Sequence, residues 1–285
     1  MFYKIPLKHL IVAISFLLFS NVQAAAIFDC VIEPTQTVEI RSPVIGLLEK
    51  VTVRRGDSVI KNQILAQLDS SVETTATDLA LYKSKMTAPI ESAENKIVYA
   101  KRKFLRRQDM HTKDFYSAQE MEEAESEFKL AQSELKMAYE NKELAKLEWE
   151  HQNSQLKLRT IRSPFDGVVV EQNIYPGEVV EPSGQKQSIL TLAQLNPLRI
   201  YVILPLSAFG KVKPAMKANV NPESPISGQY VGKVNIIDRV VNAASGTFGV
   251  FLEVPNPRFT VPAGVKCKAE FPIDLGSSQA LGNPS

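Results

Sequence analysis

The sequence predicts a mixed α and β fold, in which a small β-sandwich is split by a long antiparallel α-helical coiled-coil hairpin and is followed by a small antiparallel β-barrel. Three observations predict this fold. A short motif occurs twice, and the insertion between the two half-motifs, residues 70–158, has no glycine and repeats apolar residues every three or four positions. The segment after the second copy alternates apolar and polar residues between proline and glycine turns.

The repeated motif is a stretch of six residues that contains Ser-Pro and ends on glycine. Its copies are Arg41-Ser42-Pro43-Val44-Ile45-Gly46 and Arg162-Ser163-Pro164-Phe165-Asp166-Gly167. Neither copy can bury a core alone, so we expect the two half-motifs, residues 41–69 and 159–195, to face each other across a pseudo-twofold axis. They resemble the half-motifs of biotinyl and lipoyl domains, which implies a lipoyl-like sandwich. The turn glycines that we assign to the half-motifs are Gly46, Gly56, Gly167 and Gly177.

The same resemblance allows a test for an attached cofactor. Biotinyl and lipoyl domains carry an acceptor lysine on the hairpin between their halves, three residues after the position of Asp69. That position is Val72 here, and the next lysine is Lys83. We therefore expect no cofactor, and a biotin or lipoate carrier protein is a less favoured alternative that the intact mass of the mature protein would reveal.

The N-terminus is typical of a secretory signal peptide, which we place at residues 1–26. Lys4 and Lys8 precede an apolar run from Leu10 to Phe19, and small residues follow at positions 24–26. The competing interpretation is an uncleaved anchor, but the run is about half of the roughly 20 residues that a spanning helix needs. Cleavage and export to the periplasm are the expectation.

Cys30 and Cys267 are the two cysteines of the chain. Ile27, Phe28 and Asp29 before Cys30 lack the small residues of a lipoprotein signal, so lipidation is not expected. An oxidising compartment permits a disulfide between the two cysteines. Two buried free thiols are an equally good interpretation.

Residues 70–158 predict the helical hairpin. This segment has one proline and is rich in Ala, Glu, Lys, Gln and Leu. With a turn between about His111 and Tyr116, its two arms have roughly 40 residues each and are about 60 Å long. Pro89 is expected to bend the first arm locally.

Each arm carries a stripe of residues that predicts one coiled-coil seam. The second arm contributes Met121, Ala124, Phe128, Ala131, Leu135, Ala138, Ala145, Trp149 and Leu156, with Lys142 and Gln152 as polar exceptions. The first arm contributes Leu79, Tyr82, Met86, Ala93, Ile97, Ala100 and Phe104. Capping boxes at Ser70-Ser71-Val72-Glu73 and Ser117-Ala118-Gln119-Glu120 predict the two helix starts.

The hairpin tip resembles that of the periplasmic adaptor, or membrane fusion protein, family of HlyD and RND efflux adaptors. Tips of this family carry an arginine, a leucine, a serine and an acidic residue at a spacing that Arg106, Met110, Ser117 and Glu127 match. The resemblance implies that these residues dock onto a TolC-like outer-membrane channel. Met110 replaces the usual leucine and Glu127 the usual aspartate. Helix capping and solvation are the competing interpretation.

Residues 196–275 predict the β-barrel, which the strand at 27–40 is expected to join. Arg199 to Leu204 and Gly249 to Val254 alternate as barrel strands do. The family resemblance continues through residues 192–199, 238–250, 254–257 and 262–267. The chain stops soon after Ile273, so we expect no complete membrane-proximal domain and a disordered tail at 276–285. Contact with a pump would then fall to the barrel or to a second adaptor.

Other functions find little support in the sequence. The three histidines are scattered, and neither a phosphate-binding loop nor a dinucleotide motif is present. A formal net charge of +2 gives no argument for a nucleic-acid partner. We expect no catalytic centre, metal or cofactor.

The resemblance implies the periplasmic adaptor of a tripartite RND-type efflux pump. Such an adaptor forms a ring, such as a hexamer, that bridges an inner-membrane transporter and a TolC-like channel for the export of drugs or other small molecules. The adaptor of an ABC or type I secretion system is the nearest alternative.

Overall fold

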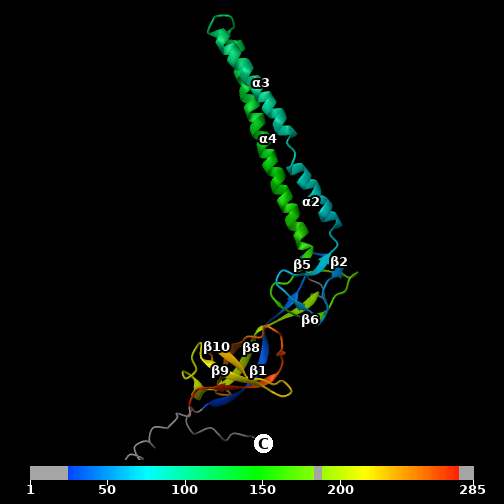
Figure 1. The fold of residues 1–285 in the computed structure, drawn as a ribbon. Coiled ribbons are helices and arrows are strands. Elements are labelled where there is room, and N and C mark those ends of the chain that lie inside the picture. Colours follow the sequence, from blue (N-terminus) through cyan, green and yellow to red (C-terminus); the bar gives the residue numbers. More distant parts are fainter. Residues whose placement is uncertain (1–24, 183–187, 276–285) are drawn as a thin grey trace, which may run out of the picture. The chain divides into compact units, whose positions relative to one another are not determined.

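The structure is a computed structural model that describes residues 25–182 and 188–275 (Figure 1). The predicted signal peptide as far as residue 24 and the predicted disordered tail lie outside the described residues. The chain divides into two compact units. One unit contains the residues up to Val38, Phe165–Val168 and the residues from Leu192 onward, and the other contains Glu39–Pro164 and Val169–Thr191.

The first unit contains the predicted antiparallel β-barrel. Its strands lie in the order β1, β12, β9, β10, β11, β8, and β1 also pairs with β8, which closes the sheet on itself. Closure leaves no free sheet edge. The strands are β1 (Ala26–Ile40), β8 (Leu190–Pro205), β9 (Lys217–Pro222), β10 (Tyr230–Ile237), β11 (Thr247–Val254) and β12 (Lys266–Phe271).

Strands β8 and β11 confirm the predicted alternation. Leu198, Ile200, Val202 and Leu204 are buried, while the residues between them lie at the surface or partly exposed. Strand β11 pairs with β8 over its whole length, from Thr247 opposite Pro205 to Val254 opposite Leu198. The short 3-10 helix η1 (Leu206–Ala208) follows β8 and adds Ala208 to the same core.

A disulfide joins Cys30 on β1 to Cys267 on β12, where the two residues lie opposite each other in the ladder. Both cysteines are buried in the barrel core. The sequence separation of 237 residues means that the bond closes a very long loop. In the chain-entropy account such a cross-link stabilises the folded state by about 5 kcal/mol.

The second unit contains the β-sandwich and the hairpin. Its sheet has the order β5, β4, β2, β7, and β3 pairs with β6. Each half-motif therefore contributes a short strand that pairs with the other half. Strand β3, which follows β2 in the chain, pairs with β6, and β7, which follows β6, pairs with β2. The strands are β2 (Gly46–Val51), β3 (Ser58–Val59), β4 (Ile64–Leu68), β5 (Thr160–Arg162), β6 (Gly167–Gln172) and β7 (Val179–Val180).

Two equivalent hydrogen bonds make the internal symmetry explicit. The amide of Gly56 donates to the carbonyl of Val169, and the amide of Gly177 donates to the carbonyl of Leu48, each at 2.8 Å. The two glycines have φ of 92° and 94°, a left-handed conformation that other residues adopt only with strain. Their sequence assignment as turn residues matches this geometry.

Gly46 and Gly167 are not turn glycines, contrary to the sequence assignment. They begin the equivalent strands β2 and β6. A Cβ atom on Gly46 would lie 2.5 Å from the Arg159 guanidinium, and one on Gly167 would lie 2.5 Å from the Ala193 carbonyl oxygen. Gly167 needs glycine because a backbone carbonyl approaches it closely, whereas the group close to Gly46 is the end of a long side chain. Sequence alone does not distinguish such close approach from a turn.

The hairpin consists of three helices, α2 (Ser71–Ser84), α3 (Ala88–His111) and α4 (Ala118–Leu158). Both α2 and α3 lie along α4, as Figure 1 shows. The predicted bend at Pro89 is a complete break, since residues 85–87 separate α2 from α3. Pro89 sits in the first turn of α3, where its missing N–H costs nothing and where it cannot continue a preceding helix.

The predicted seam is correct in α3 and α4 and wrong in α2. Leu79, Tyr82 and Met86 are exposed, and the residues of this arm turned toward α4 are Thr77, Ala80, Leu81 and Ser84. The break explains the error, because the heptad phase of α3 does not carry through residues 85–87 into α2. Within the described part of the chain, no helix combines the length and the apolar character that crossing a membrane requires.

The predicted capping box at the start of α2 does not form. The Ser70 side chain makes no cap hydrogen bond. Instead, the Asp69 carboxylate accepts from the Ser71 amide at 3.0 Å. Glu73 is drawn away from the cap because it pairs with the Arg159 guanidinium, which also donates to the Ile45 carbonyl at 3.0 Å.

Candidate docking site at the hairpin tip

The tip is a short turn between the end of α3 at His111 and the start of α4 at Ala118. Asp114 has φ of 62° and reverses the chain. The Phe115 amide donates to the Met110 carbonyl at 3.0 Å. The Nδ1 atom of His111 lies 2.8 Å from the Tyr116 carbonyl oxygen, which can only accept, so this nitrogen carries the proton. The turn is therefore fixed by hydrogen bonds to the end of α3.

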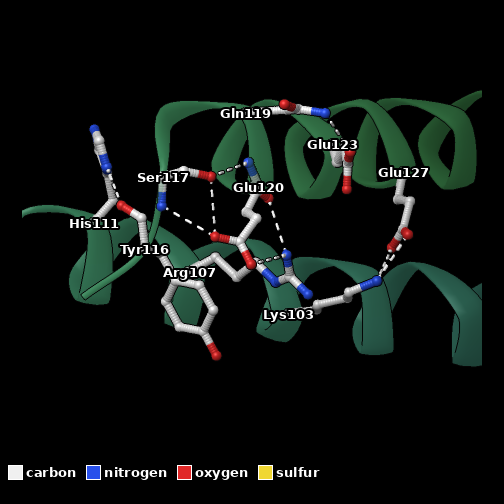
Figure 2. A network of polar contacts seen from close by, with 9 residues as sticks. All are labelled: Lys103, Arg107, His111, Tyr116, Ser117, Gln119, Glu120, Glu123 and Glu127. Atoms are coloured by element: carbon white, nitrogen blue, oxygen red, sulfur yellow. Dashed lines mark hydrogen bonds and ion pairs between the residues drawn. The ribbon is translucent and has the colours of Figure 1, made fainter. Parts of the chain in front are cut away.

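The capping box predicted at Ser117 forms and fixes the start of α4 (Figure 2). The Glu120 amide donates to Ser117 Oγ at 3.3 Å, and the Glu120 carboxylate accepts from the Ser117 amide at 3.0 Å. The hydrogen bonds from the Ser117 amide and hydroxyl, together with the nearby Arg107 cation, lower the pKa of Glu120 below its ordinary value of 4.5. The carboxylate stays ionised at neutral pH and suits a helix N-terminus.

Arg107 connects the two arms next to the turn. Its guanidinium carbon lies 5.3 Å from the centre of the Tyr116 ring, and Nη1 donates to the Glu120 carbonyl at 3.3 Å. A planar cation over an aromatic ring is favourable. Sequence reasoning did not single out Arg107. The only sequence signal was its position seven residues after Ala100 in the inward stripe of the first arm.

The four residues predicted for docking do not form one cluster. Met110 and Ser117 lie at the two edges of the turn, with Met110 half-buried and Ser117 exposed as the cap. Arg106 is exposed near the end of α3. Glu127 is about 15 Å along α4 from Ser117 and pairs with Lys103 of α3 at 2.7 Å. Ser117 and Glu127 therefore both have structural roles within the hairpin.

Sequence reasoning also missed Phe115, the most exposed large apolar side chain of the turn. Its side chain is 72% exposed, and its backbone is held by the bond to Met110. Apolar side chains of this size are often buried on association with a partner. A rigid turn that presents one exposed aromatic ring can act as an anchor for another protein.

The two arms near the tip carry opposite charge. Near the tip, α3 carries the basic residues Lys101, Arg102, Lys103, Arg106 and Arg107, and α4 carries the acidic residues Glu120, Glu122, Glu123, Glu125 and Glu127. The ion pairs that span the arms here are Lys103–Glu127 and the longer contact of Arg107 with Glu120 at 3.9 Å. In the described part of the chain, no group of three or more His, Cys, Asp or Glu side chains could hold a metal.

The chain is similar in sequence to a known domain family and to several export proteins. A family profile described as "CzcB-like, barrel-sandwich hybrid domain" matches residues 36–194, more than half of the chain. The chain is 24% identical to the pyoverdine export membrane fusion protein PvdR of Pseudomonas aeruginosa over 208 residues, which cover 72% of this chain and 53% of PvdR. It is 25% identical to the macrolide export protein MacA of Yersinia pestis, over 83% of this chain and 64% of MacA.

A similar identity of 25% relates the chain to the multidrug resistance protein MdtE of Escherichia coli K12, over 86% of this chain and 63% of MdtE. The chain thus spans between about half and two thirds of the length of these curated relatives. Among solved structures, MacA from Actinobacillus actinomycetemcomitans matches with a TM-score of 0.72 at 20% identity, covering 87% of this chain and 78% of that one. At this identity the likeness shows the fold alone.

Proposed function

Because the chain belongs to the membrane fusion, or periplasmic adaptor, protein family through its CzcB-like barrel-sandwich hybrid domain, we propose that it is the periplasmic adaptor of a tripartite RND-type efflux pump. In this role it bridges an inner-membrane transporter and a TolC-like outer-membrane channel and exports drugs or other small molecules. The function is connective rather than catalytic. The observation that carries the proposal is the rigid, capped tip at the end of a helix of 41 residues.

The tip is the end that meets the channel. The capping box, the clamp of Arg107 on Tyr116 and the backbone bond from Phe115 to Met110 hold its shape before any partner arrives. A pre-shaped surface loses little conformational entropy on binding. The docking residues are Arg106, Met110, Ser117 and Glu127, as the family resemblance implies, with Phe115 added as the apolar anchor.

A ring of copies is the second part of the proposal, and exposed apolar ridges on the two arms support it. Leu130, Met137 and Leu144 recur every seven residues on α4, and Val98 and Leu105 do so on α3, all of them exposed. Each ridge faces away from its own partner arm. The ion pairs Lys103–Glu127 and Lys96–Glu134 show which positions of the two arms lie at the same height along the hairpin.

These two pairs place Leu130 of α4 level, along the hairpin axis, with a position of α3 between Val98 and Leu105. Neighbouring copies in the same orientation would therefore bring the α4 ridge of one copy against the α3 ridge of the next. Such a contact uses two different surfaces and closes into a ring when the rotation allows it. Cross-linking of the mature protein at Leu130→Cys paired with Val98→Cys, the nearer of the two α3 ridge positions, should trap dimers and larger species, and a solely monomeric product would contradict the ring.

The docking role is tested by disulfide cross-linking in cells. A cysteine replaces Phe115, which is exposed, and the channel carries a single cysteine on its periplasmic end. The native cysteines do not compete because they form the buried barrel disulfide. We expect an adduct whose two chains mass spectrometry identifies. Leu144→Cys, exposed on the same hairpin but far from the tip, is the matched control and should give no channel adduct.

Charge reversal at Arg106 tests the same contact by function. Arg106→Glu should lower drug resistance while the protein level and the helical signal in circular dichroism stay unchanged. Lys136→Glu is the control, because Lys136 is an exposed lysine on α4 away from the tip. Full resistance in cells that express Arg106→Glu at the normal level would argue against the docking role of this residue.

The inner-membrane partner is the least constrained part of the proposal. An ATP-driven exporter of the ABC or type I secretion class is the alternative to an RND pump, and the likeness to a macrolide export protein keeps it open. Purification of the tagged adaptor from detergent-solubilised membranes, with mass spectrometry of the co-purified transporter, distinguishes the two. An RND transporter is the expected result.

A further inference from the structure

A cavity of about 410 Å³ lies in the hairpin where α2 ends and its arm is broken. It opens between the last turn of α2 and the middle of α4, away from the tip and its docking residues. Its volume falls within the range of small-molecule sites in proteins. The lining residues are Leu81, Ser84 and Lys85 from the first arm and Tyr139, Lys142, Glu143, Lys146 and Trp149 from α4.

The sequence of both arms explains why space remains at this place. The first arm leaves its helical path at residues 85–87. Opposite the break, the heptad positions of α4 are Ala138, Lys142 and Ala145, between the larger Leu135 and Trp149, and the Lys142 side chain is exposed. Small residues and a lysine that extends toward water fill less of the seam than leucines would. Neither arm therefore supplies a side chain that fills the gap.

The cavity is rich in positive charge. Lys85, Lys142 and Lys146 line it, together with one carboxylate, Glu143, which lies 3.4 Å from the Lys146 ammonium. Among the residues that the structure describes, neither Lys85 nor Lys142 has an ion-pair partner. Three ammonium groups facing one carboxylate make the site attractive to an anion.

Aromatic side chains form the other part of the lining. Trp149 is half-buried beside the three lysines. Tyr139 donates from its hydroxyl to the Glu94 carboxylate of α3 at 2.8 Å, which holds the tyrosine at the edge of the cavity. An indole face and a leucine side chain favour a flat or apolar body, while the lysines favour a charged group at its end.

We propose that this cavity binds a small organic anion that combines an aromatic body with a carboxylate or sulfonate group. The aromatic body packs on Trp149 and Leu81, and the anionic group lies between Lys85, Lys142 and Lys146. The site is separate from the docking tip, and its existence does not depend on the adaptor function.

The chain offers a direct test, because Trp149 is its sole tryptophan. The mature protein is titrated with 8-anilino-1-naphthalenesulfonate, an aromatic sulfonate that accepts excitation energy from tryptophan. We expect saturable energy transfer from Trp149 at one ligand per chain. Lys142→Glu should weaken the affinity about tenfold, as expected for an opposed charge beside the sulfonate.

Two further variants make the result specific. Lys142→Met keeps an apolar stem and the helix but removes the charge, so it should weaken sulfonate binding and leave the binding of neutral N-phenyl-1-naphthylamine unchanged. Lys136→Glu, on the outward side of α4, is the matched control and should change the affinity less than twofold. Circular dichroism checks that each variant keeps its helices.

The proposal fails if energy transfer to the sulfonate does not saturate, or if Lys136→Glu and Lys142→Glu weaken binding equally. Equal affinity of the native protein for the sulfonate and for the neutral probe would also overturn it, because the lysines would then play no part in recognition.

Discussion

The tip half of the hairpin, where α3 packs on α4, has an aromatic pair in its seam, whereas the root half, where α2 packs on the same helix, has an open cavity at the end of α2. In the tip half the rings of Phe104 and Phe128 stack at 6.0 Å between centroids, and Ala124 and Ala131 are buried. In the root half a cavity opens beside the end of α2, and the buried Thr77 hydroxyl has no hydrogen-bond partner among the described residues.

This difference teaches that the partner arm decides how well a helix is packed. Helix α4 is continuous over both halves, and its inward stripe has the same heptad spacing throughout. Helix α3 faces it with 24 residues, whereas α2 has 14 and ends at a break. Local stability can differ along one helix, because opening free energies depend on the contacts that each segment makes.

The largest expected effect comes from removing an aromatic ring in each half. Phe128→Ala should reduce the opening free energy of the tip half of α4 by about 2 kcal/mol or more, because it deletes a stacked, half-buried ring. Trp149→Ala should cost the root half less, since one side of the indole already faces a cavity. Hydrogen exchange of α4 peptides measures both. Equal losses would show that the two halves are packed equally well.

Filling the gap in the root half should have the next largest effect and the opposite sign. Lys142→Leu places an apolar side chain at a heptad position beside the cavity and should stabilise the root half of α4 by about 1 kcal/mol. Lys136→Leu, at an exposed position six residues earlier, should change exchange by less than about 0.5 kcal/mol. A destabilised Lys142→Leu variant would mean that the cavity is closed to a leucine side chain.

The two helix starts provide a matched pair of serine substitutions. Ser117→Ala removes a formed cap at the tip and should cost about 1 kcal/mol. Ser70→Ala should be nearly neutral, because the Ser70 side chain makes no cap hydrogen bond. Exchange rates in the first turns of α4 and α2 report on the two variants. A similar cost at both sites would indicate that Ser70 does act as a cap in solution.

The smallest effect is the pH dependence of the two helix starts. The Ser117 amide and hydroxyl lower the pKa of Glu120 below 4.5, and the Ser71 amide and hydroxyl lower the pKa of Asp69 below 3.8. A pKa that is lower in the folded state stabilises folding at pH values above the unfolded pKa, and this contribution is lost as the pH falls through the folded pKa. Both helix starts should therefore loosen only in acid.

Carboxyl carbon NMR titration measures these pKa values. Ser117→Ala should raise the pKa of Glu120 toward 4.5 and leave that of Asp69 unchanged. A shift of both groups would mean that the substitution acts on the whole hairpin rather than on its tip.

The tip half was predictable from sequence because its signals are local. Continuous apolar spacing, a serine three residues before a glutamate and the lack of glycine specify the helices, their seam and the start of α4. In the root half the same kinds of signal gave a wrong heptad phase for α2 and a capping box that does not form. The heptad count was carried across Pro89 as if α2 and α3 were one helix. Glu73 was predicted to cap the start of α2, but it pairs with Arg159, more than 80 residues later in the chain.

The residues proposed for docking were predicted one by one, but their arrangement was not. Spacing places Arg106, Met110, Ser117 and Glu127 near the turn, yet it cannot show that Glu127 pairs with Lys103. It also cannot show that Phe115 is the residue left exposed while Arg107 and Tyr116 pack together.

By itself, the sequence determined the fold class, the two half-motifs, the long hairpin and the capped start of α4. Each of these depends on residues near one another in the chain or on a repeat that can be counted. Only the tertiary structure decided the barrel disulfide, the close approach of other groups to Gly46 and Gly167, the phase of α2 and the cavity beside Lys142. These features arise where segments distant in sequence meet, and their packing depends on the volume and charge that each segment brings to the contact.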